Sequence, residues 1–430
     1  MQGLERLEAH EAARRIGAGE ITSEALVRAC LARIAAREGE VGAWAHVDED
    51  AALAQARALD RTAPRGPLHG VPVGIKDIID TFDLPTAHGS PIYAGNRPAC
   101  DAACVALLRE AGAVILGKTV TTEFAAVTPG KTRNPHDTRC TPGGSSSGSA
   151  AAVADFMVPA ALGTQTVGST IRPASYCGAV GFKPSYHAFS LAGVKAQAES
   201  LDTLGILARS VADILLLSDA LIGAADAFPA PMRESAPRLA FCRSPHWPKA
   251  HPSTVRVMND AVRLFRAAGA SVDELDLSAN FDRVLDAQWT ILSFEFARTL
   301  AFERTMRRDG LSERLRQLLD GGIKIPLADY RAALALAAAC RAEIAPVFDR
   351  FDALVTPAAS GEAPEGLQSP SDLLFQRLWT VLYLPVITLP GFKGERGLPI
   401  GVQLVGRSGG DGPLLSAARW AKAKMRAALK

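Results

Sequence analysis

The 430-residue sequence lacks the features that mark several broad classes of protein. Its formal net charge is only +2, and no block of Lys and Arg alternates with aromatic residues, so we expect no nucleic-acid partner. No apolar run approaches the roughly 18 residues of a membrane-spanning helix. The longest Ala-rich stretch, 332–340, lies between Arg331 and Arg341. The polar N-terminus has no basic stretch followed by an apolar core, so we expect a cytoplasmic protein without secretory signal or membrane partner.

Cysteine is also scarce, with seven residues in the whole chain. An odd number without a sign of export indicates reduced thiols rather than a disulfide framework. Cys100 and Cys104 are four residues apart, but no second Cys or His pair lies near them to complete a zinc site. We therefore predict small core residues at these positions, and neither a metal nor a cofactor.

Apolar residues make up 48% of the chain and charged residues 21%, which is typical of a globular protein with a large core. No internal repeat divides the sequence, and large α/β enzymes often fold as one body. We predict a single domain over 1–430. Within it we expect an N-terminal helical segment (1–65), a central core (66–215) and a C-terminal part (216–430) that is helical and then returns to the sheet.

Hydrophobic periodicity and turn residues predict the elements. The expected helices cover 24–37 with Ser23 as N-cap, 51–59, 103–111 ending at Gly112, a small-residue helix from about Ser149, and most of 251–350. The expected strands cover 71–75, 113–116, 386–389 and 400–405. This alternation predicts an α/β fold in which a mixed, mostly parallel sheet is covered by helices on both faces.

Two short motifs match catalytic patterns in the wrong context. Residues 112–119, GAVILGKT, fit the phosphate-binding expression G-x-x-x-x-G-K-[ST], but the four intervening residues favour a strand rather than a phosphate-cradling loop. Residues 144–148, GSSSG, fit the nucleophile elbow G-x-S-x-G, which requires a strand directly before it. A loop precedes it here, and none of the His residues downstream lies in a suggestive setting.

Three other segments carry residues suited to nucleophilic catalysis. Lys76 lies in the apolar run 71–79, where burial disfavours the ammonium form and can produce a neutral base. Residues 141–152 read TPGGSSSGSAAA, and residues 163–173 read GTQTVGSTIRP. Small residues before Ser169 leave successive backbone amides free to converge beside its hydroxyl, as an oxyanion site requires. Taken singly, the lysine also fits a side chain that extends to a sheet edge, and the Gly/Ser run a flexible linker.

Together these segments resemble the amidase signature family. Ser169 follows Ser145 by 24 residues, as the family pattern requires, and the segments 352–357 (DALVTP) and 397–403 (GLPIGVQ) also match in order. The resemblance covers about 20–420. It implies a serine amidohydrolase in which Ser169 is the nucleophile, Ser145 holds a cis peptide bond and Lys76 is the base. It further implies that the amides of Thr166, Val167, Gly168 and Ser169 bind the oxyanion.

Two departures from the family pattern bear on the substrate. Val167 replaces the usual glycine, so either the loop keeps negative φ or the oxyanion site is distorted. Gln165 and the position of Arg172 resemble the malonamidase-like branch. Arg172 then either clamps a substrate carboxylate or pairs with loop carbonyls. Gly144 and Gln165 are further expected to contact substrate.

The sequence therefore predicts hydrolysis of a small linear carboxamide through an acyl-enzyme on Ser169. Acid half-amides, aryl amides and carbamates stay open as substrates, and a homodimer stays open as the assembly. The alternatives are the glutaminase-type subunit of a tRNA-dependent amidotransferase, a scaffold whose chemistry has decayed, and a different amidase class with Cys177 as nucleophile.

Overall fold

The computed structural model describes residues 3–224, 227–233, 235–367 and 373–428. Its centre is a single sheet of 11 strands in the order β1-β3-β2-β4-β6-β5-β10-β11-β9-β7-β8. The strands are β1 Trp44–Val47, β2 Pro72–Lys76, β3 Val114–Thr119, β4 Ala160–Gln165, β5 Val180–Lys183, β6 Thr203–Ala208, β7 Arg238–Cys242, β8 Ser271–Leu275, β9 Ala353–Pro357, β10 Val386–Lys393 and β11 Pro399–Val405.

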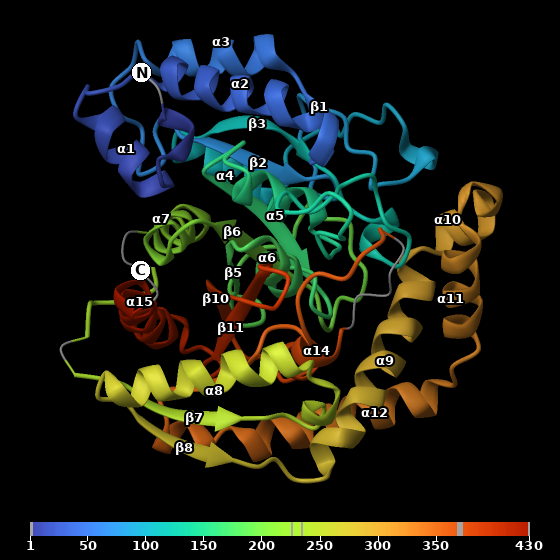
Figure 1. Ribbon diagram of the computed structural model, residues 1–430. Coiled ribbons are helices and arrows are strands. Elements are labelled where there is room, and N and C mark those ends of the chain that lie inside the picture. The colour runs from blue at the N-terminus through green and yellow to red at the C-terminus, as the bar shows by residue number, and fades with distance from the viewer. Residues whose placement is uncertain (1–2, 225–226, 234, 368–372, 429–430) are drawn as a thin grey trace.

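The α-helices surround this sheet (Figure 1). They are α1 Ala9–Gly17, α2 Ser23–Val41, α3 Glu49–Leu59, α4 Ala103–Glu110, α5 Ser147–Ala154, α6 Ile171–Cys177, α7 Val211–Ile222, α8 Pro252–Ala267, α9 Asn280–Thr299, α10 Ala301–Met306, α11 Glu313–Ile323, α12 Leu327–Ile344, α13 Val347–Arg350, α14 Leu374–Val381 and α15 Asp411–Ala428. None of the helices in the described ranges is both long and apolar enough to cross a membrane.

The predicted single-domain α/β fold with a mixed sheet is confirmed, but the expected predominance of parallel pairs is wrong. Among the described strands, the pairs β3–β2, β2–β4, β9–β7 and β7–β8 are parallel, and the other six are antiparallel. Five of these antiparallel pairs, from β4 to β9, form the middle of the sheet, and the sixth, β1–β3, lies at its edge. Strands that are buried on both faces read as continuous apolar runs in either orientation, so sequence pattern did not distinguish them.

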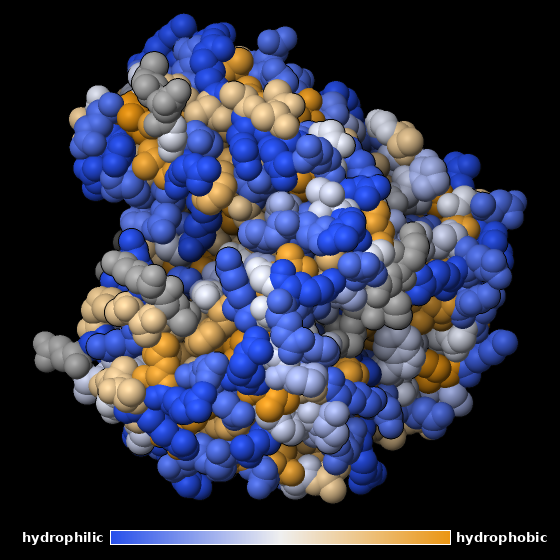
Figure 2. Space-filling view, in the orientation of Figure 1, coloured by the Kyte–Doolittle hydropathy of each residue, from blue (hydrophilic) through white to orange (hydrophobic). Residues whose placement is uncertain are grey.

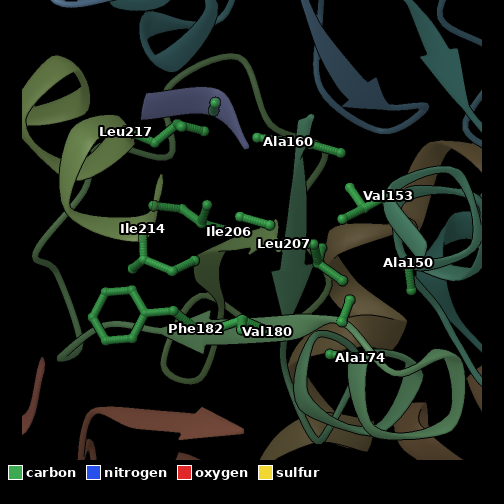
Figure 3. Close-up of a cluster of buried hydrophobic side chains, with 14 of the residues drawn as sticks. Ala150, Val153, Ala160, Ala174, Val180, Phe182, Ile206, Leu207, Ile214 and Leu217 are labelled. Carbon is green, nitrogen blue, oxygen red and sulfur yellow. The ribbon is translucent and has the colours of Figure 1, made fainter. Parts of the chain in front are cut away.

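Helices cover both faces of the central strands. Successive side chains of a strand point to opposite faces, and β6 shows this with Ile206 and Leu207. Figure 3 shows Ile206 beside the α7 residues Ile214 and Leu217, and Leu207 on the side of α5, which supplies Val153. The sheet is therefore the middle layer of one continuous core.

The N-terminal segment differs from its prediction at both ends of its main helix. The cap of α2 is Thr22, whose hydroxyl accepts from the Ala25 amide, so Ser23 is the first helical residue rather than the cap. The helix continues to Val41, where Gly42 ends it in the left-handed conformation. The segment is also not wholly helical, because it contributes β1 to the sheet edge. In the C-terminal part, the strands β7, β8 and β9 were also not among those predicted from the sequence.

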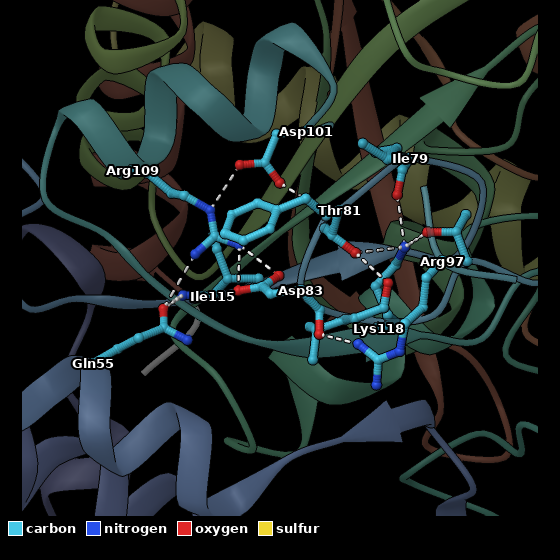
Figure 4. Close-up of polar contacts among 12 residues, drawn as sticks. Gln55, Ile79, Thr81, Asp83, Arg97, Asp101, Arg109, Ile115 and Lys118 are labelled. Atoms are coloured by element: carbon cyan, nitrogen blue, oxygen red, sulfur yellow. Dashed lines mark hydrogen bonds and ion pairs between the residues drawn. The ribbon is translucent and has the colours of Figure 1, made fainter. Parts of the chain in front are cut away.

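The structure excludes the phosphate-loop interpretation of 112–119. Gly112 has φ 88° and follows α4, and β3 then runs through Thr119, so the motif's Lys118 lies on a buried strand. Its ammonium donates to the Ile79 carbonyl at 2.6 Å and to the hydroxyls of Thr81 and Thr86 (Figure 4). Because these three contacts use the N–H donors of the ammonium group, Lys118 fixes the loop after β2 instead of binding phosphate.

Helices α9 to α12 form an arm at one side of the molecule, and α12 runs behind β7 and β8 in the view of Figure 1. Within it α9 contacts both α11 and α12, and it also contacts α14. On the face shown in Figure 2, hydrophilic side chains predominate and apolar ones lie between them. The arm matters because one face of it borders the cavity described below.

We expect Gly112→Ala to destabilise the protein by about 1–3 kcal/mol. A Cβ at this position would lie 2.8 Å from the His69 Cα, and its φ disfavours any L side chain. The matched control is Gly321→Ala in α11, where a Cβ meets nothing within 4 Å; this change should raise the free energy of unfolding by up to about 1 kcal/mol. Denaturant unfolding measures both. Equal effects of the two substitutions would contradict the assignment of Gly112 as a helix terminus.

Candidate active site

A cavity of about 210 Å³ lies where the loops after β4 and before α5 meet the helical arm. Among the sequence-predicted residues, it is lined by Gly144, Ser145, Val167, Ser169 and Arg172. The structure thus brings together two motifs that the sequence separates. Its other lining residues are Thr122, Ala125, Ala126, Val127, Pro129, Thr141, Gly143, Gln197, Trp289, Leu292, Arg314, Leu318, Leu367 and Leu373.

Lys76 is the last residue of β2 and lies behind this cavity. Its Nζ is 2.8 Å from the Ser145 Oγ and 2.7 Å from the Thr164 Oγ1. The side chain has 0% exposure. Burial is the main reason that the pKa of Lys76 falls to about 7, and the charge of Asp202 opposes the shift. A lysine with such a pKa can act as a neutral base near pH 7.

Ser145 lies just before α5, and the Gly144–Ser145 peptide bond is cis, as the resemblance implied. The Gly144 carbonyl accepts a hydrogen bond from the Arg172 guanidinium at 2.5 Å. Arg172 is 6% exposed and lines the cavity at the same time. Part of its hydrogen-bonding capacity therefore holds the segment that carries Ser145.

Ser169 lies between β4 and α6, with its hydroxyl beside the cavity. Its carbonyl accepts from the Ser146 amide at 3.1 Å, which ties the two serine loops together. Within the described ranges, the Ser169 hydroxyl makes no hydrogen bond. The backbone amides of 166–169 also donate to no acceptor there. Unbonded amides in a buried loop are suited to binding an oxyanion.

Val167 does not distort this loop. None of residues 166–169 has positive φ, so the β-branched side chain keeps an ordinary backbone conformation. The Thr380 hydroxyl donates to the Val167 carbonyl at 2.9 Å and fixes its orientation. At the next position, a Cβ on Gly168 would lie 2.8 Å from the Gln376 Oε1. The glycine that this loop requires is therefore Gly168, where a side chain has no room.

Two expected site residues lie elsewhere. Gln165 is fully buried and does not line the cavity. Its amide donates to Thr380, and its carbonyl oxygen accepts from the amides of Thr170 and Ile171, so it supports the loop instead of contacting substrate. Cys177 is also fully buried outside the lining, and burial raises the pKa of its thiol well above the usual range. This position contradicts the alternative of a Cys177 nucleophile.

Sequence reasoning missed a buried carboxylate next to the loop. Asp202 accepts from the Thr166 hydroxyl at 2.5 Å and from the Gln197 amide at 2.7 Å. Burial raises the pKa of Asp202 to about 6. It lies 33 residues beyond Ser169 in no recognisable motif, so only the folded chain reveals that it supports the loop.

The rim of the cavity was also missed. Trp289 and Leu292 of α9 are three residues apart, and Arg314 and Leu318 of α11 are four apart, so each helix presents one face. No motif marks these positions. Among the described residues, the one grouping with metal-ligand spacing is Glu8, His10 and Asp213, and it lies outside the cavity lining.

Comparison with known proteins is consistent with this geometry. Residues 25–415 match the model of the family described as Amidase. A glutamyl-tRNA(Gln) amidotransferase subunit from Geobacter sp. (strain M21) is 34% identical over 95% of each chain. A solved amidase structure superposes with a TM-score of 0.89 at 32% identity and covers 97% of this chain and all of that one. The peptide amidase from Stenotrophomonas maltophilia superposes with a TM-score of 0.85 at 30% identity and covers 97% of each chain.

We expect the pH dependence of stability to reveal the depressed pKa of Lys76. Between about pH 7 and 10.5 the folded side chain is neutral while the unfolded one is protonated, so the unfolded state binds more protons. The free energy of unfolding of the wild type should therefore rise with pH relative to Lys76→Met, by at most about 1.4 kcal/mol per pH unit. Denaturant unfolding at several pH values gives the difference. A flat difference across this window would show that the lysine titrates normally.

Proposed function

Because this chain belongs to the amidase family, we propose that it is a serine amidohydrolase that cleaves a small linear carboxamide through an acyl-enzyme on Ser169. The observation that carries the proposal is the contact between the buried Lys76 and Ser145 beside a cavity that also contains Ser169. A serine hydroxyl is a poor nucleophile at neutral pH and requires a base. A desolvated lysine supplies one.

The proposed proton path runs from Ser169 through Ser145 to neutral Lys76. As the Ser169 oxygen attacks the amide carbonyl carbon, its proton passes to Ser145 and the Ser145 proton passes to Lys76. The relay then returns a proton to the leaving nitrogen, and the C–N bond breaks to release the amine. Water attacks the resulting ester through the same relay and frees the acid. Thr164 holds the Lys76 amine in position and takes no proton.

The proposed oxyanion site consists of backbone amides from Thr166, Val167, Gly168 and Ser169. Two observations support this assignment. The four amides belong to one buried loop, and that loop is held by the Thr380 hydroxyl at the Val167 carbonyl and packs against Gln376 at Gly168. A donor that is fixed before the reaction needs no reorganisation as charge develops on the carbonyl oxygen. Each such donor contributes about 10²–10³-fold to kcat in comparable sites.

Arg172 and Gly144 belong to the same proposed machinery. We assign Arg172 as a positioning residue, because its guanidinium holds the Gly144 carbonyl next to Ser145. Its charge also lies at the cavity wall, where it favours an anionic substrate. The finer placement in a malonamidase-like branch stays a prediction, because none of the relatives named above is described as a malonamidase.

A second candidate function is the glutaminase subunit of a tRNA-dependent amidotransferase. The amidotransferase relative named above favours it, since the match spans nearly the whole chain. The chemistry at Ser169 would be the same, and glutamine is itself a small amide. The two candidates differ in whether the isolated chain turns over.

We expect Ser169→Ala, Ser145→Ala and Lys76→Ala each to lower kcat by about 10³-fold or more on a p-nitroanilide or a simple amide. Because the three groups form one relay, the double variant of Ser145 and Lys76 should lose little beyond either single one. Cys177→Ala serves as the control and should keep its activity. Steady-state kinetics decide, and full activity in Ser169→Ala would refute the proposal.

We expect kcat/KM of the free enzyme to fall about tenfold per pH unit below an apparent pKa near 7. The reason is that protonation of Lys76 removes the base, and its pKa is about 7. A neutral amide should be used, so that the substrate does not titrate. A profile that stays flat from pH 5 to pH 8 would exclude Lys76 as the base.

The two candidate functions are separated by assaying the isolated chain. Turnover of half-amides, anilides or carbamates that depends on Ser169 supports a free-standing amidohydrolase. Glutamine hydrolysis that appears only after partner subunits of an amidotransferase are added supports the second candidate. Failure of every substrate under both conditions would favour the decayed scaffold.

A further inference from the structure

The charges that line the cavity are of one sign. Arg172 and Arg314 both border it, and no Asp or Glu is among the lining residues in the described part of the chain. The remaining lining is largely apolar, with Trp289, Leu292 and Leu318 on the side of the helical arm. A small cavity with two guanidinium groups and apolar walls favours an anion that carries a hydrocarbon segment.

The two arginines differ in their surroundings. Arg172 is 6% exposed and donates to the Gly144 carbonyl, so it is committed to the protein. Arg314 is exposed, and it makes no hydrogen bond or ion pair with any described residue. On its helix, the residues three and four positions further along are Gln317 and Leu318, neither of which is acidic.

Packing of the arm fixes where Arg314 lies. On α11, Leu315 and Leu319 are buried against Phe296, Ala297 and Leu300, which come from α9 and its end. Because these leucines anchor one face of α11, the adjoining face with Arg314 and Leu318 borders the cavity. Ser169 is buried at the inner end, while Arg314 is exposed at the mouth.

We propose that Arg314 makes the enzyme prefer negatively charged substrates, because it binds a carboxylate remote from the scissile amide. The inference rests on the proposed function and names its substrate class: amides in which an apolar segment joins the carboxylate to the reacting carbonyl. In this arrangement the apolar segment of the substrate contacts Trp289, Leu292 and Leu318, and its amide group lies at Ser169. A guanidinium pairs with a carboxylate through two parallel hydrogen bonds.

This carboxylate can belong to either half of the substrate. In the monoamide of a dicarboxylic acid it lies on the acyl side, and in an N-acyl amino acid it lies on the amine side. Both present the same anion to Arg314, so both enter the experiment. Each acid amide is paired with a neutral amide of equal length, and an amino-terminated amide supplies the opposite charge.

The test compares Arg314→Gln and Arg314→Glu with the wild type. Arg316→Gln is the matched control, since it removes the same charge from the same helix outside the cavity lining. For the preferred acid amide, Arg314→Gln should raise KM about tenfold with little change in kcat, because remote binding is shared by ground and transition states. The neutral amide should be unaffected.

Two further results are expected if Arg314 recognises the charge of the substrate. Arg314→Glu should reverse the preference, so that the amino-terminated amide outperforms the acid amide. Raising the salt concentration should weaken the preference for the acid amide more in the wild type than in Arg314→Gln, which keeps only the buried Arg172 charge in the lining. Whichever acid amide shows this response identifies the half of the substrate that carries the carboxylate.

Binding to Ser169→Ala, measured by calorimetry with the unreacted acid amide, separates the two proposals. Loss of affinity on adding Arg314→Gln supports the role of Arg314 even if catalysis proves to differ. An equal effect of Arg314→Gln on acid and neutral amides, an equal effect of Arg316→Gln, or a wild type without preference would overturn it. Absence of Ser169-dependent turnover of the neutral amide would instead refute the proposed hydrolase.

Discussion

The desolvation of Lys76 is the constraint on which the rest of the site depends. An ammonium group held at 0% exposure with hydroxyl partners loses hydration that those partners replace only in part. This loss of hydration lowers the pKa of Lys76 to about 7. The lysine at this buried strand end is thus suited to act as a base, and β2 is buried there because β3 and β4 pair with its two edges.

The loops around Lys76 are held in place by side chains that contact their backbone. Three side chains hold the backbone of these loops: Arg172 donates to the Gly144 carbonyl, Thr380 donates to the Val167 carbonyl, and Gln165 accepts from the two amides at the start of α6. Asp202 instead holds a side chain, the Thr166 hydroxyl. These contacts are the physical form of preorganisation, because the amides near Ser169 are left unbonded while their neighbours are fixed.

The proposed chemistry and the proposed substrate selectivity come from different parts of the fold. The proposed relay and oxyanion loop lie on the sheet and its adjoining turns, whereas the rim of the cavity is built in part by α9 and α11 of the arm. An amidohydrolase and a glutaminase subunit can therefore share the first set of residues and differ in the second. This division agrees with relatives that carry different names but match over nearly the whole chain.

The sequence by itself determined the α/β class and the family, and it singled out Lys76, Ser145 and Ser169 as the proposed catalytic residues, because short-range motifs with fixed spacing carry that information. It also rejected the phosphate loop, since four apolar residues favour a strand. Tertiary structure alone decided the antiparallel centre of the sheet, the supporting role of Gln165 and the burial of Cys177. It alone placed Asp202 and Arg314 at the site. Such contacts join residues far apart in the chain, and no local periodicity or motif records which distant segment a side chain will meet.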